Sequence, residues 1–245
     1  MLTKNKIKFI KSLQQKKHRT EAGSFVVEGR KGIEALIDSQ FEVEELYITE
    51  QLKAKMPSLE ALEYVIADVA SIERASGLKS NIEGIAVVKQ RKARRADFTG
   101  VSLYLDGVSD PGNLGTIIRT ADWFGITQIV YSEECVDFYN PKVIQSTMGS
   151  FVKYLPVILT PEAFMKRKPE DFSIFVTAFG GESPTLLSGV EKGVLVMGSE
   201  SHGVSDYWLK SAFTKVTIPF AEGTGAESLN VGVAASILCY QIKQG

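Results

Sequence analysis

Cysteine, histidine and long apolar runs are scarce in this chain, and each shortage excludes a class of protein. Two cysteines, Cys135 and Cys239, provide neither a disulfide framework nor a zinc-ligand cluster, and His18 and His202 are too far apart to suggest a metal site. No apolar run approaches the about 18 residues that a membrane span needs, and the N-terminus lacks the apolar core of a secretory signal. We therefore expect a soluble, cytoplasmic protein without a metal site or a membrane anchor.

Net charge is also nearly absent, but the charges are unevenly distributed along the chain. The 245 residues include 28 basic and 29 acidic side chains, and the total of −1 gives no sign of a nucleic-acid partner. Residues 1–97 contain 18 basic and 14 acidic side chains, a charge of +4, whereas the remainder contains 10 and 15, a charge of −5. The positive first part indicates an anionic partner that the total charge conceals.

The first 19 residues concentrate this positive charge, with seven basic and no acidic side chains. Ile7, Ile10 and Leu13 recur at intervals of three, which predicts a short helix with one buried stripe and lysines directed to solvent. The pattern is compatible with a solvated helix face and with a surface that contacts nucleic-acid phosphates. On the second interpretation, the candidate nucleic-acid-binding residues are Lys11, Lys16, Lys17 and Arg19, together with Arg30 further along this part of the chain.

A second basic run, at residues 89–95, separates two stretches in which strand and helix patterns alternate. The first stretch has predicted strands at 25–27, 45–48, 64–67 and 85–88 and predicted helices at 31–38 and 70–76. The second has predicted strands at 102–105, 128–131, 154–158, 173–177, 194–197 and 215–218. We expect an α/β protein with two domains, 1–97 and 98–245. The larger domain should contain a mostly parallel sheet with helices on both faces.

Open α/β sheets bind ligands where their strands end, and the first of three unusual strand ends lies at residues 106–121. This segment reads DGVSDPGNLGTIIRTA, which predicts a strand, a Pro-Gly turn and a helix that Asn113 can cap. Arg119 stands in that helix beside Ile117 and Ile118, an unusual setting for a solvated cation. The segment lacks the GxGxxG pattern of a dinucleotide site.

The other two strand ends are rich in glycine. Residues 194–204 read VLVMGSESHGV, in which Glu200 lies between glycines that permit close backbone approach, although a plain strand–turn–helix connection is an alternative. Residues 218–237 read IPFAEGTGAESLNVGVAASI, a loop followed by a helix that Ser228 begins, with Asn230 in its first turn. The apolar face of this helix would comprise Leu229, Val233, Ile237 and Tyr240.

In this order, the three segments resemble the three motifs of the SpoU (TrmH-like) family of RNA ribose 2′-O-methyltransferases, in the SPOUT superfamily. The resemblance extends from Asp106 to the C-terminus and includes the small-residue segment 145–150. The basic first part, with Phe25 and the sequence Glu28-Gly29-Arg30, looks like the family's ribosomal-protein-like RNA-binding domain. The resemblance implies a trefoil knot in the second domain, S-adenosylmethionine as cofactor and a homodimer formed through the C-terminal domain. It also implies methyl transfer to a ribose 2′-hydroxyl of structured RNA, with ribosomal RNA favoured over transfer RNA.

The resemblance also assigns roles to particular residues. The implied catalytic residues are Arg119, Asn113, Glu200, Ser228 and Asn230, and the implied cofactor-binding residues are Ala178, Phe179, Gly180, Gly198, Glu200, Ile218 and Leu229. Arg119 is the implied central residue. Because a guanidinium rarely loses its proton, a bidentate grip on the phosphate beside the target ribose is physically easier for Arg119 than acting as a base.

Two departures from the family pattern concern the loops. Ser201-His202 stand where the family often has a glycine and a basic residue, and the loop at residues 221–227 is longer than in many members. Two other functions stay open: a non-catalytic RNA-binding protein with an inherited fold, and a knotted RNA base methyltransferase. The intact polar motif residues argue against the first, and the Ser-Leu-Asn sequence at 228–230 argues against the second.

Overall fold

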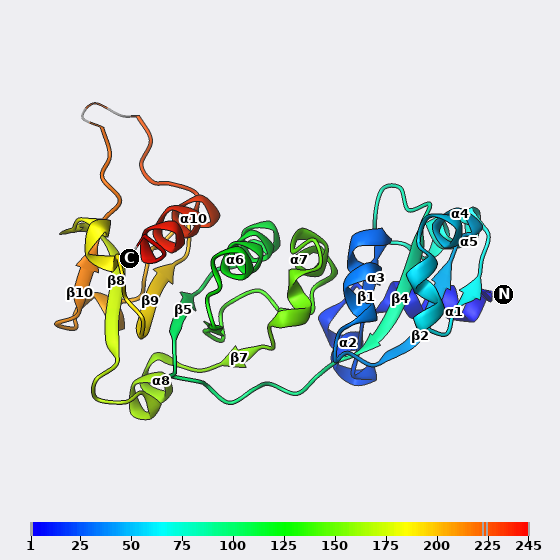
Figure 1. The fold of residues 1–245 in the computed structure, drawn as a ribbon, viewed down its shortest axis with the longest axis horizontal. Helices are drawn as coiled ribbons and strands as arrows, with labels where there is room; N and C mark the ends of the chain where they lie inside the picture. Colours follow the sequence, from blue (N-terminus) through cyan, green and yellow to red (C-terminus); the bar gives the residue numbers. More distant parts are fainter. Residues whose placement is uncertain (1, 222, 224, 245) are drawn as a thin grey trace. The chain divides into compact units, whose positions relative to one another are not determined.

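The computed structural model describes residues 2–221, 223 and 225–244, and its chain forms two compact units (Figure 1). Unit 1 contains Met1–Lys92 and Asp137–Lys153, and unit 2 contains Ala93–Val136 and Tyr154–Gly245. The segment 137–153 therefore packs with the N-terminal part of the chain, although it lies inside the predicted second domain. The division of the sequence into domains at residues 97 and 98 stays a prediction.

Unit 1 is built on a four-stranded sheet. Its strands are β1 (Ser24–Glu28), β2 (Val43–Ile48), β3 (Val65–Ile66) and β4 (Gly84–Lys89). Its helices are α1 (Lys4–Ser12), α2 (Lys16–Ala22), α3 (Gly29–Ile37), α4 (Glu50–Lys55), α5 (Val69–Ala75) and α7 (Pro141–Ser146), with 3₁₀ turns η1 (Pro57–Ala61) and η2 (Ser150–Lys153). The strand order is β1-β4-β2-β3, with β4 antiparallel to both of its neighbours. The strands and helices predicted for this part are confirmed, with small shifts at their ends.

The basic N-terminal segment forms two helices, α1 and α2. The Thr3 side chain caps α1 by accepting a hydrogen bond from the Lys6 N–H, and Ile10 and Leu13 are buried, as their spacing predicts. The lysines on the outer side of both helices are exposed: Lys4, Lys8, Lys11, Lys16 and Lys17. The segment thus has the amphipathic character that the sequence indicates.

Aromatic rings hold the segment 137–153 in unit 1. The Phe25 ring of β1 lies 4.7 Å from the Tyr139 ring and 6.1 Å from the Phe151 ring, measured between centroids. The Tyr139 hydroxyl donates a hydrogen bond of 2.9 Å to the carbonyl of Arg91, just after β4. Burial of large rings contributes strongly to packing, so these contacts explain why the segment folds with β1 and β4.

Unit 2 is built on a six-stranded sheet with the order β10-β8-β9-β5-β6-β7. Its strands are β5 (Val101–Asp106), β6 (Gln128–Tyr131), β7 (Val157–Ile158), β8 (Ser173–Glu182), β9 (Gly193–Gly198) and β10 (Thr214–Val216). Its helices are α6 (Pro111–Phe124), α8 (Pro161–Arg167), α9 (Asp206–Leu209) and α10 (Val231–Ile242), with the 3₁₀ turn η3 (Pro184–Leu187). All neighbouring strands pair in parallel, which confirms the predicted sheet. β7 is shorter than predicted and β8 is longer.

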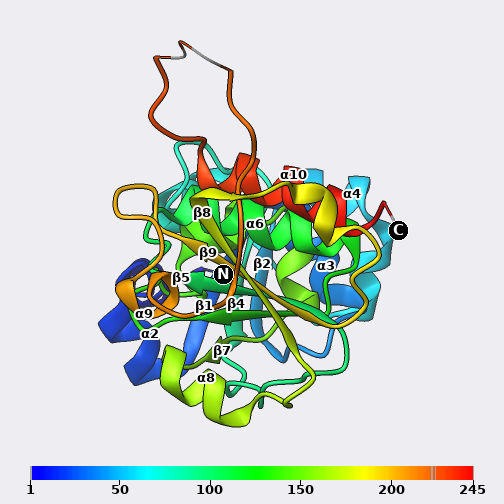
Figure 2. The same ribbon diagram turned by 90° about the vertical axis from the view of Figure 1, so that its left-hand side faces the viewer.

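Helices cover both faces of this sheet, with α6 and α10 on one face and α8 and α9 on the other (Figure 2). On the second face, the buried rings of Tyr104, Phe164 and Trp208 form one cluster, and the centroids of Tyr104 and Trp208 lie 4.9 Å apart. Because side chains alternate along a strand, the buried Leu103 and Leu105 point to the face that α6 and α10 cover. β5 is therefore fixed from both sides. Among the helices in the described residues, none is long and apolar enough to cross a lipid bilayer.

Candidate functional site

Two of the three unusual segments leave the sheet at the same edge. β5 and β9 pair in parallel, and their last residues, Asp106 and Gly198, are register partners. Asp106 is 8% exposed, and its carboxylate accepts a hydrogen bond of 2.7 Å from the Ser205 N–H. The loops that follow β5 and β9 thus begin side by side at the carboxyl edge of the sheet, where such sheets bind ligands.

Hydrogen bonds join three of the five candidate catalytic residues. The Asn230 side-chain amide donates to the Asn113 side-chain oxygen at 2.8 Å, and the Asn113 amide donates to Glu200 Oε1. The Asn230 oxygen accepts from the N–H groups of Gly232 and Val233, which fixes the orientation of its amide. One residue from each unusual segment therefore meets in a continuous polar chain.

The caps of α6 and α10 differ from the prediction. Asp110, not Asn113, caps α6: its carboxylate accepts the Asn113 N–H at 2.8 Å, and Pro111 occupies the first helical position, where no N–H is needed. Asn230, not Ser228, caps α10, which begins at Val231. The first correction explains how the Asn113 side chain is free to bridge the other two residues.

Arg119 and Ser228 do not join this chain. Arg119 lies six positions after Asn113, about 240° around α6, and is exposed. Ser228 is exposed in the loop before α10. Neither side chain has a hydrogen bond or an ion pair with another part of the chain that the structure describes. Of the five candidate catalytic residues, the structure of unit 2 therefore brings three into direct contact: Asn113, Glu200 and Asn230.

Position 198 requires a glycine because the backbone of residues 203 and 204 lies too close for any side chain there. A Cβ at this position would lie 1.9 Å from the carbonyl carbon of Gly203 and 2.1 Å from the nitrogen of Val204. Ser199 and Gly203 pair through two backbone hydrogen bonds of 3.0 Å, and Gly203 has a φ of +67°. The turn that presents Glu200 therefore closes only when residue 198 has no side chain.

The predicted cofactor loop after residue 177 is part of a longer strand. β8 continues to Glu182, so Ala178, Phe179 and Gly180 lie within it, which corrects the prediction of a strand end at residue 177. Val176 and Glu182 pair with consecutive residues of β10, so the residues between them bulge out of the ladder. Gly180 has a φ of +70°, as expected for a residue in such a bulge.

The model of the SpoU rRNA methylase family matches residues 100–240, and the model of the MRM3-like substrate binding domain matches residues 4–79. The chain belongs to the SpoU rRNA methylase family. It is 29% identical to RlmP, the 23S rRNA (guanosine(2553)-2′-O)-methyltransferase of Bacillus subtilis, over 97% of this chain and 96% of RlmP.

Two solved structures are similar to this chain along nearly its whole length. One, from Porphyromonas gingivalis, is described as an RNA methyltransferase of the TrmH family, with a TM-score of 0.85 and 31% identity over 100% of this chain and 99% of that one. The other is an AdoMet-bound rRNA methyltransferase from Sinorhizobium meliloti, with a TM-score of 0.84 and 27% identity over 99% and 95%. The predicted family and α/β fold are therefore confirmed.

Thr217 holds the β8 bulge of this SpoU protein, and the sequence interpretation missed it. Its hydroxyl donates to the carbonyl of Ala178 and accepts the N–H of Gly181 at 2.6 Å. The only local signal was a hydroxyl residue next to the predicted cofactor-binding residue Ile218. Thr217 therefore connects the predicted cofactor-binding residues of β8, which begin with Ala178, to Ile218.

Two of the predicted cofactor-binding residues, Phe179 and Leu229, present exposed apolar side chains. Phe179 is 70% exposed, and its ring meets the exposed ring of Phe220 edge to face with centroids 6.2 Å apart. Leu229 is exposed, and a Cβ on Gly180 would meet nothing within 4 Å. Exposed apolar side chains beside an uncrowded glycine suit an adenosyl group. Among the described residues, no cluster of histidine, cysteine and carboxylate side chains could hold a metal ion.

Residues 132–136 form hydrogen bonds with the start of the first SpoU motif and with the end of β5. The N–H of Gly107 donates to the Ser132 hydroxyl at 3.0 Å, and the Val136 N–H donates to the Val108 carbonyl at 3.0 Å. The Cys135 thiol donates to the Leu105 carbonyl at 3.2 Å, and burial raises the pKa of this thiol, which keeps it a proton donor. The loop between β5 and α6, which ends at the helix cap Asp110, is thus tied to the chain after β6.

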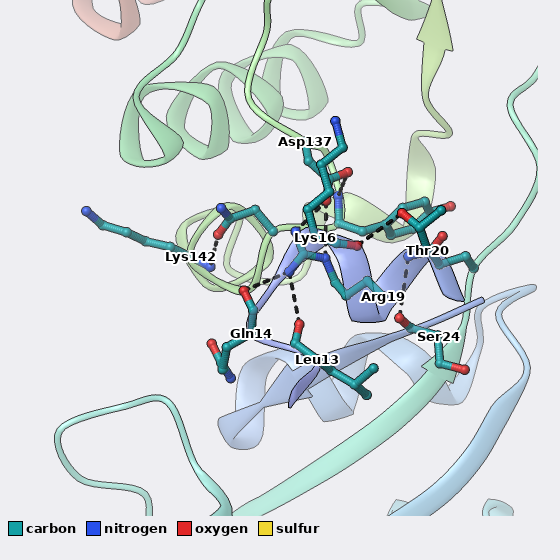
Figure 3. Close-up of polar contacts among 11 residues, drawn as sticks. Leu13, Gln14, Lys16, Arg19, Thr20, Ser24, Asp137 and Lys142 are labelled. Atoms are coloured by element: carbon teal, nitrogen blue, oxygen red, sulfur yellow. Dashed lines mark hydrogen bonds and ion pairs between the residues drawn. The ribbon is translucent and has the colours of Figure 1, made fainter. Parts of the chain in front are cut away.

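The candidate RNA-binding residues have different environments. Lys11, Lys16 and Lys17 are exposed, whereas Arg30 is partly buried with its backbone N–H bound to Glu83 at 2.6 Å. Arg19 is 1% exposed and its guanidinium is hydrogen-bonded within unit 1 (Figure 3). The expectation that Arg19 contacts RNA is therefore corrected, because a phosphate cannot reach a guanidinium that is buried and already bonded.

Proposed function

We propose that this chain transfers a methyl group from S-adenosylmethionine to a ribose 2′-hydroxyl of ribosomal RNA. The observation that carries the proposal is the polar chain Asn230–Asn113–Glu200, which joins one residue of each family motif at the carboxyl edge of the sheet. The names of RlmP and of the AdoMet-bound Sinorhizobium meliloti protein support the reaction, the cofactor and the class of RNA.

S-adenosylmethionine, when bound, supplies a methyl group attached to a sulfonium. An oxygen can attack this methyl carbon, and the sulfur then leaves as a thioether. The backbone around Gly180 and Gly198 and the side chains of Phe179, Ile218 and Leu229 would hold it. This assignment follows the family resemblance, and so does the trefoil knot around the cofactor. The exposed apolar surface and the bulge between β8 and β10 support the placement.

The protein must align the ribose hydroxyl with the methyl carbon, and the hydroxyl proton passes to a carboxylate or phosphate oxygen as the oxygen–methyl bond forms and the sulfur–methyl bond breaks. Glu200 Oε1 is bonded to Asn113, which leaves Oε2 to accept a hydrogen bond from the ribose. In this proposal Asn113 and Asn230 hold the two loops together, and Ser228 takes the role that the family resemblance implies, a hydrogen bond near the reacting hydroxyl. The Arg119 guanidinium grips the adjacent phosphate with two parallel hydrogen bonds.

A homodimer formed through α6 and α10 would place Arg119 at the subunit interface. The Thr120 and Ser236 hydroxyls lie 3.1 Å apart and the Phe124 and Tyr240 rings lie 6.3 Å apart, and both contacts join residues 116 positions apart, so the helices run parallel. Residues 120 and 124 of α6 face residues 236 and 240 of α10. Because the helices are parallel, residues 119 and 123 of α6 and residue 237 of α10 point to the same side of this helix pair. That side presents Arg119, Trp123, Val233 and Ile237 to solvent, and Trp123 is 84% exposed. Such an apolar face is typical of a subunit contact.

We expect Trp123→Glu to convert this dimer into a monomer and to abolish methyl transfer, because it places a charge in the centre of the apolar face. Light scattering coupled to gel filtration measures the change in mass. The control is Ile158→Glu, which changes an exposed apolar side chain of β7 and should leave both mass and transfer unchanged. A Trp123→Glu protein with the mass of the wild type would exclude this face as the interface.

We expect Thr217→Val to weaken binding of S-adenosylmethionine about tenfold, since it removes both hydrogen bonds that hold the β8 bulge. Thr217→Ser keeps the hydroxyl and should bind within about twofold of the wild type. Isothermal titration calorimetry measures both affinities. Equal affinities for the valine variant and the wild type would show that the bulge does not need Thr217.

The proposed partners are ribosomal RNA and a second copy of the chain, and the proposed location is the cytoplasm. Incubation of the protein with unmodified ribosomal RNA and isotope-labelled S-adenosylmethionine, followed by digestion of the RNA to nucleosides, tests the reaction. Label in a 2′-O-methylnucleoside, identified by mass spectrometry, supports it. Label in a base-methylated nucleoside would favour a base methyltransferase, and cofactor binding without any transfer would favour a non-catalytic RNA-binding protein.

A further inference from the structure

Arg19 makes four hydrogen bonds inside unit 1, which sets it apart from the lysines around it (Figure 3). Nη1 donates to the carbonyls of Leu13 and Gln14, each at 2.9 Å. Nε and Nη2 donate to Oδ2 of Asp137 at 3.1 and 2.5 Å. The Arg19 side chain is 2% exposed and that of Asp137 is 20% exposed. A buried guanidinium with this many partners has one fixed position.

The two carbonyls that Arg19 binds lie where α1 ends. Leu13 is the C-cap of α1, and the last carbonyls of a helix lack partners within it. A cation at this end of the helix is also favoured by the helix dipole. Arg19 thus locks α1 to α2, the helix that carries the exposed Lys16 and Lys17. Arg19 therefore connects the helix that carries these lysines to Asp137.

Asp137 stands one peptide bond after the last residue of unit 2. The chain passes from unit 2 to unit 1 between Val136 and Asp137. In unit 1, Asp137 Oδ1 accepts the Tyr139 N–H at 3.2 Å, so the carboxylate uses both oxygens. In unit 2, the Val136 N–H donates to the Val108 carbonyl. Val108 lies five residues before Asn113, in the loop that supports the polar chain.

We propose that Arg19 and Asp137 form a positioning pair that couples RNA bound by the lysines of α2 to the motif loop carrying Asn113. This inference rests on the proposed function. Neither residue touches the RNA or the cofactor. The pair acts through Val136, so that RNA held on α2 stabilises segment 105–113, from the end of β5 to the first turn of α6, in the arrangement that aligns Asn113 with Glu200.

The test compares steady-state methylation of ribosomal RNA by the full-length wild type, Asp137→Asn and Arg19→Lys. Asp137→Asn keeps the shape of the side chain and removes its charge. We expect kcat to fall about tenfold or more in both variants, because small misplacements of catalytic groups have effects of this size. The KM for RNA and the Kd for S-adenosylmethionine should stay within about twofold of the wild type.

Two control variants separate coupling from RNA affinity and from stability. Lys16→Gln combined with Lys17→Gln should raise the KM for RNA, because these lysines are exposed cations. Leu52→Ala removes a fully buried side chain of α4 in unit 1 and should lower stability without lowering kcat. Hydrogen exchange supplies a direct readout. RNA should increase protection of residues 105–113 in the wild type and in Leu52→Ala, but not in Asp137→Asn.

Each other result would overturn the proposal. An unchanged kcat in folded Asp137→Asn means that the pair does not position the loop. A rise in KM alone means that the pair only shapes the RNA-binding helices. Loss of folding in both variants, judged by circular dichroism, assigns the pair to stability. A wild-type protein that binds S-adenosylmethionine but does not methylate ribosomal RNA contradicts the proposed function instead, which keeps the two failures distinguishable.

Discussion

We expect replacement of Arg119 with alanine to lower kcat/KM for methylation of ribosomal RNA by about a hundredfold to a thousandfold, the cost typical of losing one preorganised charge-stabilising donor. The guanidinium is exposed and has no hydrogen bond or ion pair within the described part of the chain, so it is available to a substrate phosphate. The Kd for S-adenosylmethionine should stay unchanged, since the predicted cofactor-binding residues lie on other elements. Methyl-transfer assays and calorimetry measure the two quantities.

Two further variants make the Arg119 result specific. Arg119→Lys keeps the charge but loses the planar fork, so we expect activity between those of the wild type and Arg119→Ala. Arg167→Ala removes an exposed arginine at the end of α8, on the opposite face of the sheet, and should not change transfer. Light scattering should show that Arg119→Ala remains dimeric. Full activity in Arg119→Ala would remove this residue from the reaction.

Gly198→Ala should lower the free energy of unfolding by about 3 kcal/mol or more and abolish binding of S-adenosylmethionine. The added Cβ would lie 1.9 Å from the backbone of Gly203, so the turn between residues 198 and 204 must open. Opening this turn displaces Glu200 from Asn113. Urea denaturation and calorimetry measure the two effects.

Gly225→Ala is the matched control for Gly198. A Cβ at Gly225 would meet nothing within 4 Å, so this variant should change the free energy of unfolding by less than about 1 kcal/mol. If Gly198→Ala were as stable as Gly225→Ala, the close backbone approach at residue 198 would not exist in solution.

The strands and helices of this fold can be predicted from the sequence because their buried apolar residues recur at the spacing of a strand or of a helix. β6 occupies residues 128–131, the same four residues that the sequence predicts as a strand. The parallel sheet follows from the alternation of strands with helices. β8 is longer than the strand predicted from the sequence. The sequence Gly180-Gly181 is typical of a turn, but the strand continues because it pairs with β10, which lies more than thirty residues later along the chain.

The polar chain of the site is only partly visible in the sequence. Asn113 is a good helix cap by residue type, and so is Ser228, but Asp110 and Asn230 take these positions. The choice depends on where the neighbouring loops lie, which local patterns do not contain. The Ala221 to Glu227 loop, predicted to be longer than in many relatives, includes residues 222 and 224, which lie outside the described residues.

Arg19 shows the same limit for charge patterns. In sequence it is one of seven cations in the first 19 residues, which contain no acid, and nothing local separates it from Lys16 or Lys17. Its partner Asp137 stands 118 residues later. Burial and pairing of a single cation depend on such distant contacts, so composition predicted a basic surface but not which member of it is structural.

The central claim is that the methyl group goes to a ribose oxygen, and alkaline hydrolysis of methylated ribosomal RNA tests this most directly. Alkali cleaves RNA through attack by the 2′-oxygen, so a 2′-O-methyl group protects the bond that follows it. We predict alkali resistance at a defined nucleotide after treatment with the wild type and S-adenosylmethionine, and none after treatment with Arg119→Ala. Methyl incorporation by the wild type without any alkali-resistant bond would contradict the account.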